Sequence, residues 1–130
     1  MTSNVEVVPT PVVDQMQRRG AWNPLWDKLH EWDPAWTEKF IVTAMQPWQS
    51  GVLGPKFVEL LSIAVDAAAT HMYAPGVRRH IRMALELGAT REEILEVLKL
   101  TTLLGIHACN VGVPILAGEL VRRKQRSGDD

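Results

Sequence analysis

Histidine and carboxylate side chains recur in the second half of this sequence at spacings that suit proton transfer. Glu59 begins a helical stripe of polar residues that includes Asp66 and Thr70, whereas the rest of that segment is apolar. His80 lies in the middle of the apolar face of the next segment. Since imidazole ordinarily titrates near neutral pH, a histidine held beside a carboxylate is a candidate general acid or base.

Two further histidines extend this candidate site. His71 ends the segment that carries Glu59, and His107 follows Gly105, where the chain is expected to turn back. The ends of adjoining helices could therefore bring three histidines and the carboxylate stripe to one pocket. The alternative is structural: His80 as a hydrogen-bonded core residue, and the polar stripe as a solvated face.

The elements that would position these residues are all expected to be helices, because no segment alternates with period two for long enough to be a strand. The fold class is therefore all-α. In the second half of the chain, helices are predicted over residues 55–73, with an interruption at Ala-Pro-Gly, residues 74–76, then over 77–87, over 91–105, and from Pro114 onwards.

The clearest helix boundary is the short turn in "GATREEILEVL". Gly88 can close one helix in the left-handed conformation, and Thr90 with Glu93 can form a capping box for the next. This turn predicts an antiparallel helical hairpin. Residues 94–104 are apolar around most of their circumference, which predicts burial in a subunit interface and thus a homo-oligomer.

The N-terminal part is expected to differ in character. Residues 1–20 are predicted to be a flexible arm, residues 21–126 a single all-α domain, and residues 127–130 a tail. Asn23-Pro24 and Asp33-Pro34 each combine an N-cap residue with proline at the first helical position. The tryptophans of this segment are read as packing residues, with an aromatic ligand cage as the alternative.

Composition limits the classes of function. The 130 residues include 14 basic and 15 acidic side chains, so nothing points to nucleic acid. The single cysteine, Cys109, rules out an internal disulfide and is expected to be a packing residue. No signal peptide is evident, and no apolar run is judged long enough to cross a membrane. A cytoplasmic protein without a membrane partner is expected.

The run from residue 55 to residue 116 resembles the carboxymuconolactone decarboxylase family, which is related to the alkylhydroperoxidase D-like proteins. The resemblance rests on Glu59-Leu60, on His80, on "ALELGATREEILEVL", and on Gly105 after the apolar run. It implies an alkylhydroperoxidase D-like all-α fold, assembled as trimers or hexamers through the helical hairpin.

The resemblance also separates two chemistries. Peroxidase-type members carry a CxxC four residues before the equivalent of His80, whereas this chain has Tyr73 and Gly76 there, which excludes thiol peroxidase chemistry. Decarboxylase-type members work without a metal or organic cofactor, so no cofactor is expected. The muconolactone enzymes continue with tyrosine, glycine and proline after the apolar helix; here the chain reads Leu-Gly-Ile-His, residues 104–107.

The expected function is cofactor-independent decarboxylation, or proton transfer, on a small unsaturated lactone acid from aromatic catabolism. His80 is assigned to acid–base work with Glu59 orienting it, and His71 and His107 to binding or polarising the substrate. The remaining candidate substrate contacts are Asp66, Thr70 and Tyr73. Two alternatives stay open: a non-catalytic oligomeric helical module, and a metal site formed by His71, His80 and His107 with Asp66 or Glu59.

Overall fold

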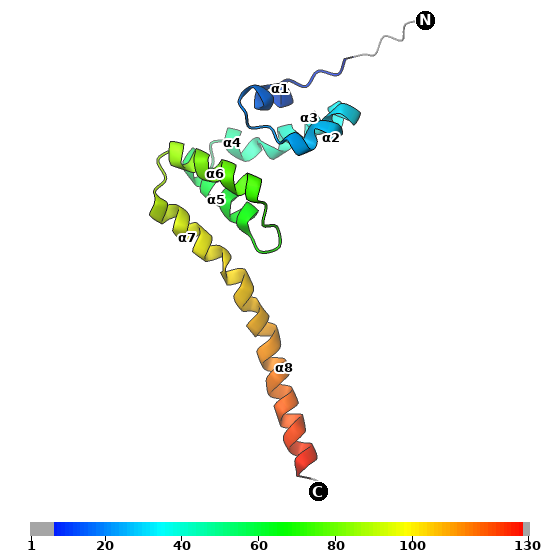
Figure 1. The fold of residues 1–130 in the computed structure, drawn as a ribbon, viewed down its shortest axis with the longest axis vertical. Helices are drawn as coiled ribbons and strands as arrows, with labels where there is room; N and C mark the ends of the chain where they lie inside the picture. Colours follow the sequence, from blue (N-terminus) through cyan, green and yellow to red (C-terminus); the bar gives the residue numbers. More distant parts are fainter. Residues whose placement is uncertain (1–6, 129–130) are drawn as a thin grey trace, which may run out of the picture. The chain divides into compact units, whose positions relative to one another are not determined.

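A computed structural model describes residues 7–128, in which all regular structure is helical and no strand occurs (Figure 1). The all-α prediction is confirmed. The elements are α1 Pro11–Arg18, η1 Pro24–Trp26, α2 Asp27–Trp32, α3 Pro34–Ala44, α4 Gln46–Gln49, α5 Pro55–Ala67, α6 Ala74–Glu86, α7 Arg91–Thr101 and α8 Leu103–Ser127.

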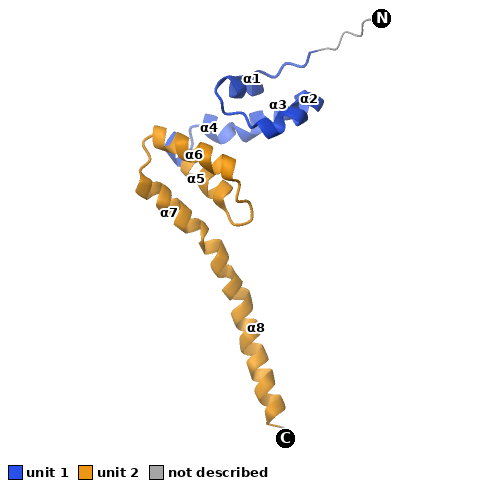
Figure 2. Ribbon diagram, in the orientation of Figure 1, with its two compact units in different colours: residues 1–58 blue, residues 59–130 orange. Residues whose placement is uncertain are grey.

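Contacts divide the chain into two compact units, residues 1–58 and residues 59–130 (Figure 2). The sequence predicted one domain over residues 21–126, and that boundary stays a prediction. Each unit is described by itself below.

In the N-terminal unit, residues 11–18 form α1 where a flexible arm was expected. Val13 is fully buried, and the backbone N–H groups of Val12 and Val13 donate to the two carboxylate oxygens of Glu38 on α3, at 2.8 and 2.9 Å. A carboxylate from a distant helix thus satisfies free N–H groups in the first turn of α1. Residues 1–6 of the predicted arm lie outside the described residues.

The predicted helix starts in the tryptophan-rich segment are confirmed. Asn23 accepts from the N–H of Leu25 at 3.1 Å, and Asp33 accepts from the N–H of Trp36 at 3.0 Å. The aromatic rings contact one another: Trp22 and Trp26 meet edge to face, whereas Trp36 and Phe40 stack. Trp32 and Trp36 are 77% and 50% exposed in the single chain, so packing stays a prediction for the role of the tryptophans.

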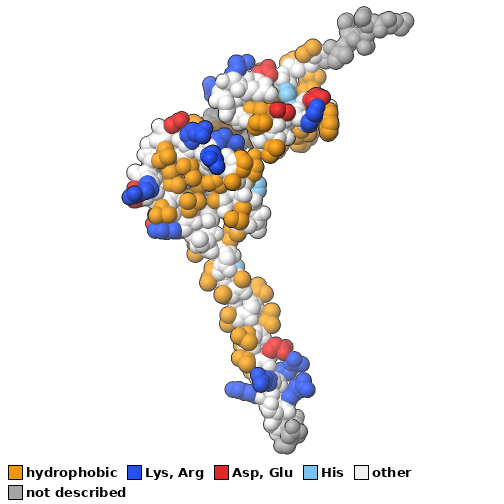
Figure 3. All heavy atoms as spheres, viewed as in Figure 1, with side chains coloured by type: hydrophobic (Ala, Val, Ile, Leu, Met, Phe, Trp, Pro, Cys, Tyr) orange, Lys and Arg blue, Asp and Glu red, His pale blue; other side chains and the backbone are white. Residues whose placement is uncertain are grey.

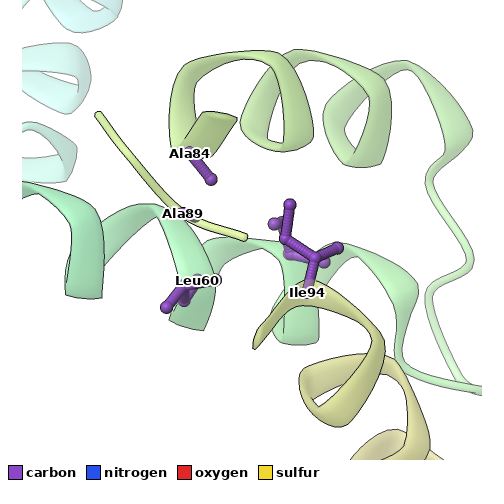
Figure 4. Packing of buried hydrophobic residues seen from close by; sticks show 5 residues of the cluster. Leu60, Ala84, Ala89 and Ile94 are labelled. Atoms are coloured by element: carbon purple, nitrogen blue, oxygen red, sulfur yellow. The ribbon is translucent and has the colours of Figure 1, made fainter. Parts of the chain in front are cut away.

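The C-terminal unit has its core between α5, α6 and α7 (Figure 4). Leu60 and Ile63 of α5 pack with Ala84 of α6, Ala89 of the following turn and Ile94 of α7. Burial of a side chain such as Ile63 contributes about 1.5–3 kcal/mol to folding. Partly buried side chains that extend the cluster are Ile81, Val97 and Leu98.

The turn between α6 and α7 forms as predicted. Gly88 has a positive φ of 88°, which glycine adopts without strain. The Thr90 hydroxyl accepts from the N–H of Glu93 at 3.0 Å, and the Glu93 carboxylate accepts from the N–H of Thr90 at 2.8 Å. Both bonds of the capping box are therefore present.

The boundaries of α5 and α6 differ from the prediction. The helix expected over residues 55–73 ends at Ala67, and Ala74-Pro75-Gly76 is the first turn of α6 rather than an interruption. Proline is compatible with a first helical turn because the N–H it lacks would have no partner inside the helix.

The prediction that the chain turns back near Gly105 and that a new helix begins at Pro114 is wrong. α8 runs unbroken through both residues, from Leu103 to Ser127. An internal proline removes one helical hydrogen bond and clashes with the preceding turn. This cost is local, so a helix can still continue through Pro114. No residue of α8 is buried, and apolar side chains lie along it (Figure 3).

The expectation that no apolar run is long enough to cross a membrane is wrong. The stretch Arg91–Ser127 is long and apolar enough to cross a membrane by length and composition. The same criterion is met by a helix that is covered inside a protein assembly, so this finding alone does not identify what covers α8.

Candidate functional site

The centre of the candidate site is the pair formed by His80 on α6 and Glu59 on α5. The Nδ1 atom of His80 lies 2.6 Å from Oε2 of Glu59. Both side chains are shielded from solvent, with 13% of His80 and 6% of Glu59 exposed. The placement of His80 on an inward face, beside the first residue of the polar stripe, agrees with the sequence analysis.

The contact with Glu59 sets the chemistry of the imidazole. A carboxylate accepts hydrogen bonds, so Nδ1 of His80 acts as the donor to Glu59. The ring then offers Nε2 as its second nitrogen, and Nε2 lies 3.6 Å from Oδ2 of Asp66. His80 is therefore placed between two carboxylates of the same helix.

Asp66 also contacts a second histidine. Its Oδ1 atom lies 3.3 Å from Nε2 of His71. Asp66 is largely covered, with 14% of its side chain exposed, whereas 54% of the His71 side chain is exposed. The four residues form a line of contacts in the order His71, Asp66, His80, Glu59.

Of the other predicted site residues, Tyr73 adjoins this line and Thr70 lies further out. The backbone N–H of Tyr73 donates to the carbonyl oxygen of Asp66 at 2.7 Å, and its ring lies 5.5 Å from that of His71. Thr70 is exposed in the turn that follows α5. Tyr73 is thus placed to border the line.

His107 is not brought into this group. It lies in α8, is exposed, and has none of the ion-pair contacts that join His71, Asp66, His80 and Glu59 in the described chain. The reason is that α8 continues through Gly105. Because the chain does not turn back there, His107 stays on α8 and does not return to α5 and α6.

The metal-site alternative finds no support in the described residues. Within residues 7–128, no group of three or more histidine, cysteine, aspartate or glutamate side chains is arranged to hold a metal ion. The line of contacts described above runs from residue to residue and does not converge on one point.

Two surface depressions occur elsewhere in the chain. One is lined by residues of α8 from Glu119 to Ser127, and the other by residues between Gln46 and Leu53. Neither is lined by the His80 group. The candidate site is therefore identified by its polar contacts and not by these depressions.

One residue of this site was missed by the sequence analysis. Gly76, in the first turn of α6, is buried, and a Cβ atom built on it would lie 1.8 Å from Oδ2 of Asp66. No sequence signal marked it, because the need for a small residue at this position comes from the approach of Asp66 from α5. The sequence analysis considered Gly76 only as part of the Ala-Pro-Gly interruption and as a position without sulfur.

The chain is similar in sequence and in structure to proteins of one family. The profile described as "Carboxymuconolactone decarboxylase family" matches residues 34–106. A solved structure from Burkholderia xenovorans LB400, provisionally described as a gamma-carboxymuconolactone decarboxylase subunit, is 42% identical and aligns with a TM-score of 0.72. The match covers 86% of this chain and 45% of that chain. The comparison with curated proteins gave no match.

Proposed function

The chain belongs to the carboxymuconolactone decarboxylase family, and on this premise we propose that it decarboxylates a small unsaturated lactone acid without a cofactor. The observation that carries the proposal is the shielded contact between His80 Nδ1 and Glu59 Oε2 at 2.6 Å. The chain spans about half the length of the solved structure that it matches. The proposal therefore rests on the residues of this chain and not on the activity of that longer protein.

The reaction needs a proton donor in a shielded site. When the carboxylate of an unsaturated lactone acid leaves as carbon dioxide, its bonding electrons delocalise into the lactone carbonyl. Carbon then takes up a proton, so one proton is consumed for each carbon dioxide released. A protonated imidazole supplies that proton at neutral pH, and shielding from bulk water strengthens its interaction with the developing negative charge.

His80 is proposed as this donor, acting through Nε2. Glu59 holds the ring through Nδ1, which lies 2.6 Å from Oε2 in a contact that is shielded from solvent. A hydrogen bond from Nδ1 to a carboxylate fixes the ring orientation, and so fixes where Nε2 points. Glu59 is thus a positioning residue for His80.

The substrate is proposed to approach from the side of Tyr73 and Thr70, outside the line of contacts. Tyr73 is half-buried and adjoins both Asp66 and His71. His107 lacks the contacts of the other site residues, so we propose no role for it within a single chain.

We also propose that the active form is a homo-oligomer, a trimer or a hexamer. The support is the exposure of α8, which has no buried residue and whose large apolar side chains are 48–65% exposed in the single chain. An assembly of several chains would cover these apolar side chains.

The test of the catalytic proposal is the His80→Gln variant, assayed with carboxymuconolactone as substrate. Glutamine keeps a hydrogen-bond donor near Glu59 but cannot deliver a proton. Turnover should fall about 10²- to 10⁴-fold, the usual contribution of an acid–base group, while the melting temperature changes little.

The opposite result is equally clear. If His80 is only a core residue, His80→Gln should lower the melting temperature, and turnover per folded chain should stay at the wild-type value. That outcome would remove the acid–base assignment. A wild-type chain that does not consume carboxymuconolactone would remove the proposed reaction itself.

A further inference from the structure

Gly76 leaves a space that the carboxylate of Asp66 fills. A Cβ atom at position 76 would lie 1.8 Å from Oδ2 and 2.7 Å from Cγ of Asp66, and 2.7 Å from Cδ1 of Tyr73. A real Cβ atom essentially never makes non-bonded contacts this short, so a neighbouring side chain would have to move. The φ of Gly76 is not positive, so glycine is favoured here by the space that it leaves and not by backbone conformation.

The space places Asp66 between two imidazoles that differ in exposure. Oδ1 faces His71 Nε2 at 3.3 Å, and Oδ2 faces His80 Nε2 at 3.6 Å. His71 is more than half exposed, whereas Asp66 and His80 are both mostly covered. Side-chain contacts thus lead from the exposed His71 through Asp66 to the mostly covered His80, and the last contact, at 3.6 Å, must shorten for a proton to pass.

We propose that His71 and Asp66 form a proton relay that reprotonates His80 from solvent after each turnover. The inference rests on the proposed function, since decarboxylation consumes one proton per cycle and His80 is shielded by the surrounding residues. It gives Asp66 and His71 a role other than the substrate contacts expected from the sequence. Gly76 is the positioning residue that makes the relay possible.

The relay conserves protons and charge at every step. After His80 has given its Nε2 proton to the substrate carbon, protonated His71 transfers a proton from Nε2 to Oδ1 of Asp66. Rotation of the carboxyl group about the Cβ–Cγ bond brings that proton to the position of Oδ2, from which it passes to Nε2 of His80. His71 then takes a proton from water, and Asp66 is again a carboxylate.

A purely structural role for Asp66 would have different consequences. The carboxylate lies beside the first turn of α6, where a negative charge stabilises a helix. A helix-stabilising carboxylate affects the melting temperature but does not make the turnover rate depend on the buffer. A turnover rate that rises when a small proton donor is added to the buffer therefore indicates a relay and not a purely structural role for Asp66.

The experiment compares the wild-type chain with His71→Ala and Asp66→Asn in rapid-mixing assays on carboxymuconolactone. In dilute buffer, both variants should complete the first turnover faster than the later ones, because the first uses the proton already on His80. Later turnovers should be roughly tenfold or more slower, and added imidazole should restore them, as expected for a lost acid–base group. The exposed carboxylate variant Glu92→Gln is the matched control and should show no such burst.

The geometry is tested separately by a double-variant cycle that does not depend on activity. Gly76→Ala should lower the melting temperature by a few degrees, because the Asp66 carboxylate and the Tyr73 ring must move to admit the Cβ. Combining it with Asp66→Ala should recover the part of that loss that comes from the Asp66 carboxylate. Gly54→Ala, at a position with open space around it, is the control and should change the melting temperature little.

Each outcome decides a different claim. A wild-type chain without turnover overturns the proposed function and the relay with it. An active wild-type chain whose His71→Ala variant shows neither a burst nor rescue by imidazole overturns the relay alone. A Gly76→Ala chain as stable as the wild type overturns the placement of Asp66 on which the relay depends.

Discussion

At the scale of single residues, the site depends on two carboxylates of α5 that face one imidazole of α6. Glu59 and Asp66 are seven residues apart, which is close to two helical turns, so both side chains point to the same side of α5. One contacts Nδ1 of His80 and the other faces Nε2. A single helix thus brackets the imidazole from both of its nitrogen atoms.

This arrangement was only partly predictable. Periodicity placed His80 on an apolar face and Glu59 and Asp66 on one stripe, because those relations depend on a single helix. The close approach of Asp66 to Gly76 depends on the path of residues 68–73, which no local pattern encodes. The hydrogen bond from Tyr73 N–H to the carbonyl oxygen of Asp66 is the contact that fixes this path.

Cys109 provides a prediction at this scale. It is exposed on α8 and is the only cysteine of the chain, so it has no partner thiol within one subunit. Replacement by serine keeps its size, and we expect Cys109→Ser to retain most of the turnover with carboxymuconolactone. A loss of activity in a variant with unchanged circular dichroism would argue for a covalent mechanism through sulfur.

At the scale of helices, the ends that depend on neighbouring residues were predictable, whereas the ends that depend on distant partners were not. The caps at Asn23, Asp33 and Thr90 all form as expected, because each involves residues no more than three positions apart. α1 was missed because its first turn is stabilised by Glu38, about 25 residues away. The continuity of α8 was missed because Pro114 is normally a helix start.

The capping box of α7 can be tested directly. Thr90→Ala removes the acceptor for the N–H of Glu93, and we expect it to lower the free energy of unfolding by about 1 kcal/mol in urea titrations. Thr90→Ser keeps the hydroxyl and should stay close to the wild type. Equal stability of the two variants would mean that the box contributes nothing measurable to folding.

At the scale of the whole molecule, the exposed apolar surface of α8 is the feature that most disfavours the single chain in water. Its large apolar side chains are 48–65% exposed in the single chain; they are Leu103, Leu104, Ile106, Val111, Val113, Ile115, Leu116, Leu120 and Val121. A surface of this extent is typical of an interaction site. Leu98, by contrast, packs against the core of the C-terminal unit, so a charge there would test folding and not association.

Two kinds of partner fit a helix of this length, and its polar residues favour one of them. His107, Asn110 and Glu119 lie along the apolar stretch of α8. A charged or strongly polar side chain within a lipid bilayer costs several kcal/mol, whereas a subunit interface can supply partners for it. This argument favours the covering of α8 by other copies of the chain.

The corresponding prediction concerns Ile115, which is 61% exposed on α8. We expect the wild-type chain to sediment as an oligomer at micromolar concentration and Ile115→Asp to sediment as a smaller species, because an unpaired charge in an apolar interface costs several kcal/mol. The matched control is Gln125→Asp in the polar end of the same helix, which should leave the oligomer intact. Recovery of the wild-type chain in detergent-extracted membranes, or a wild-type monomer in solution, would contradict the proposed subunit interface. A smaller Ile115→Asp species with unchanged helical content would show that α8 itself holds the subunits together.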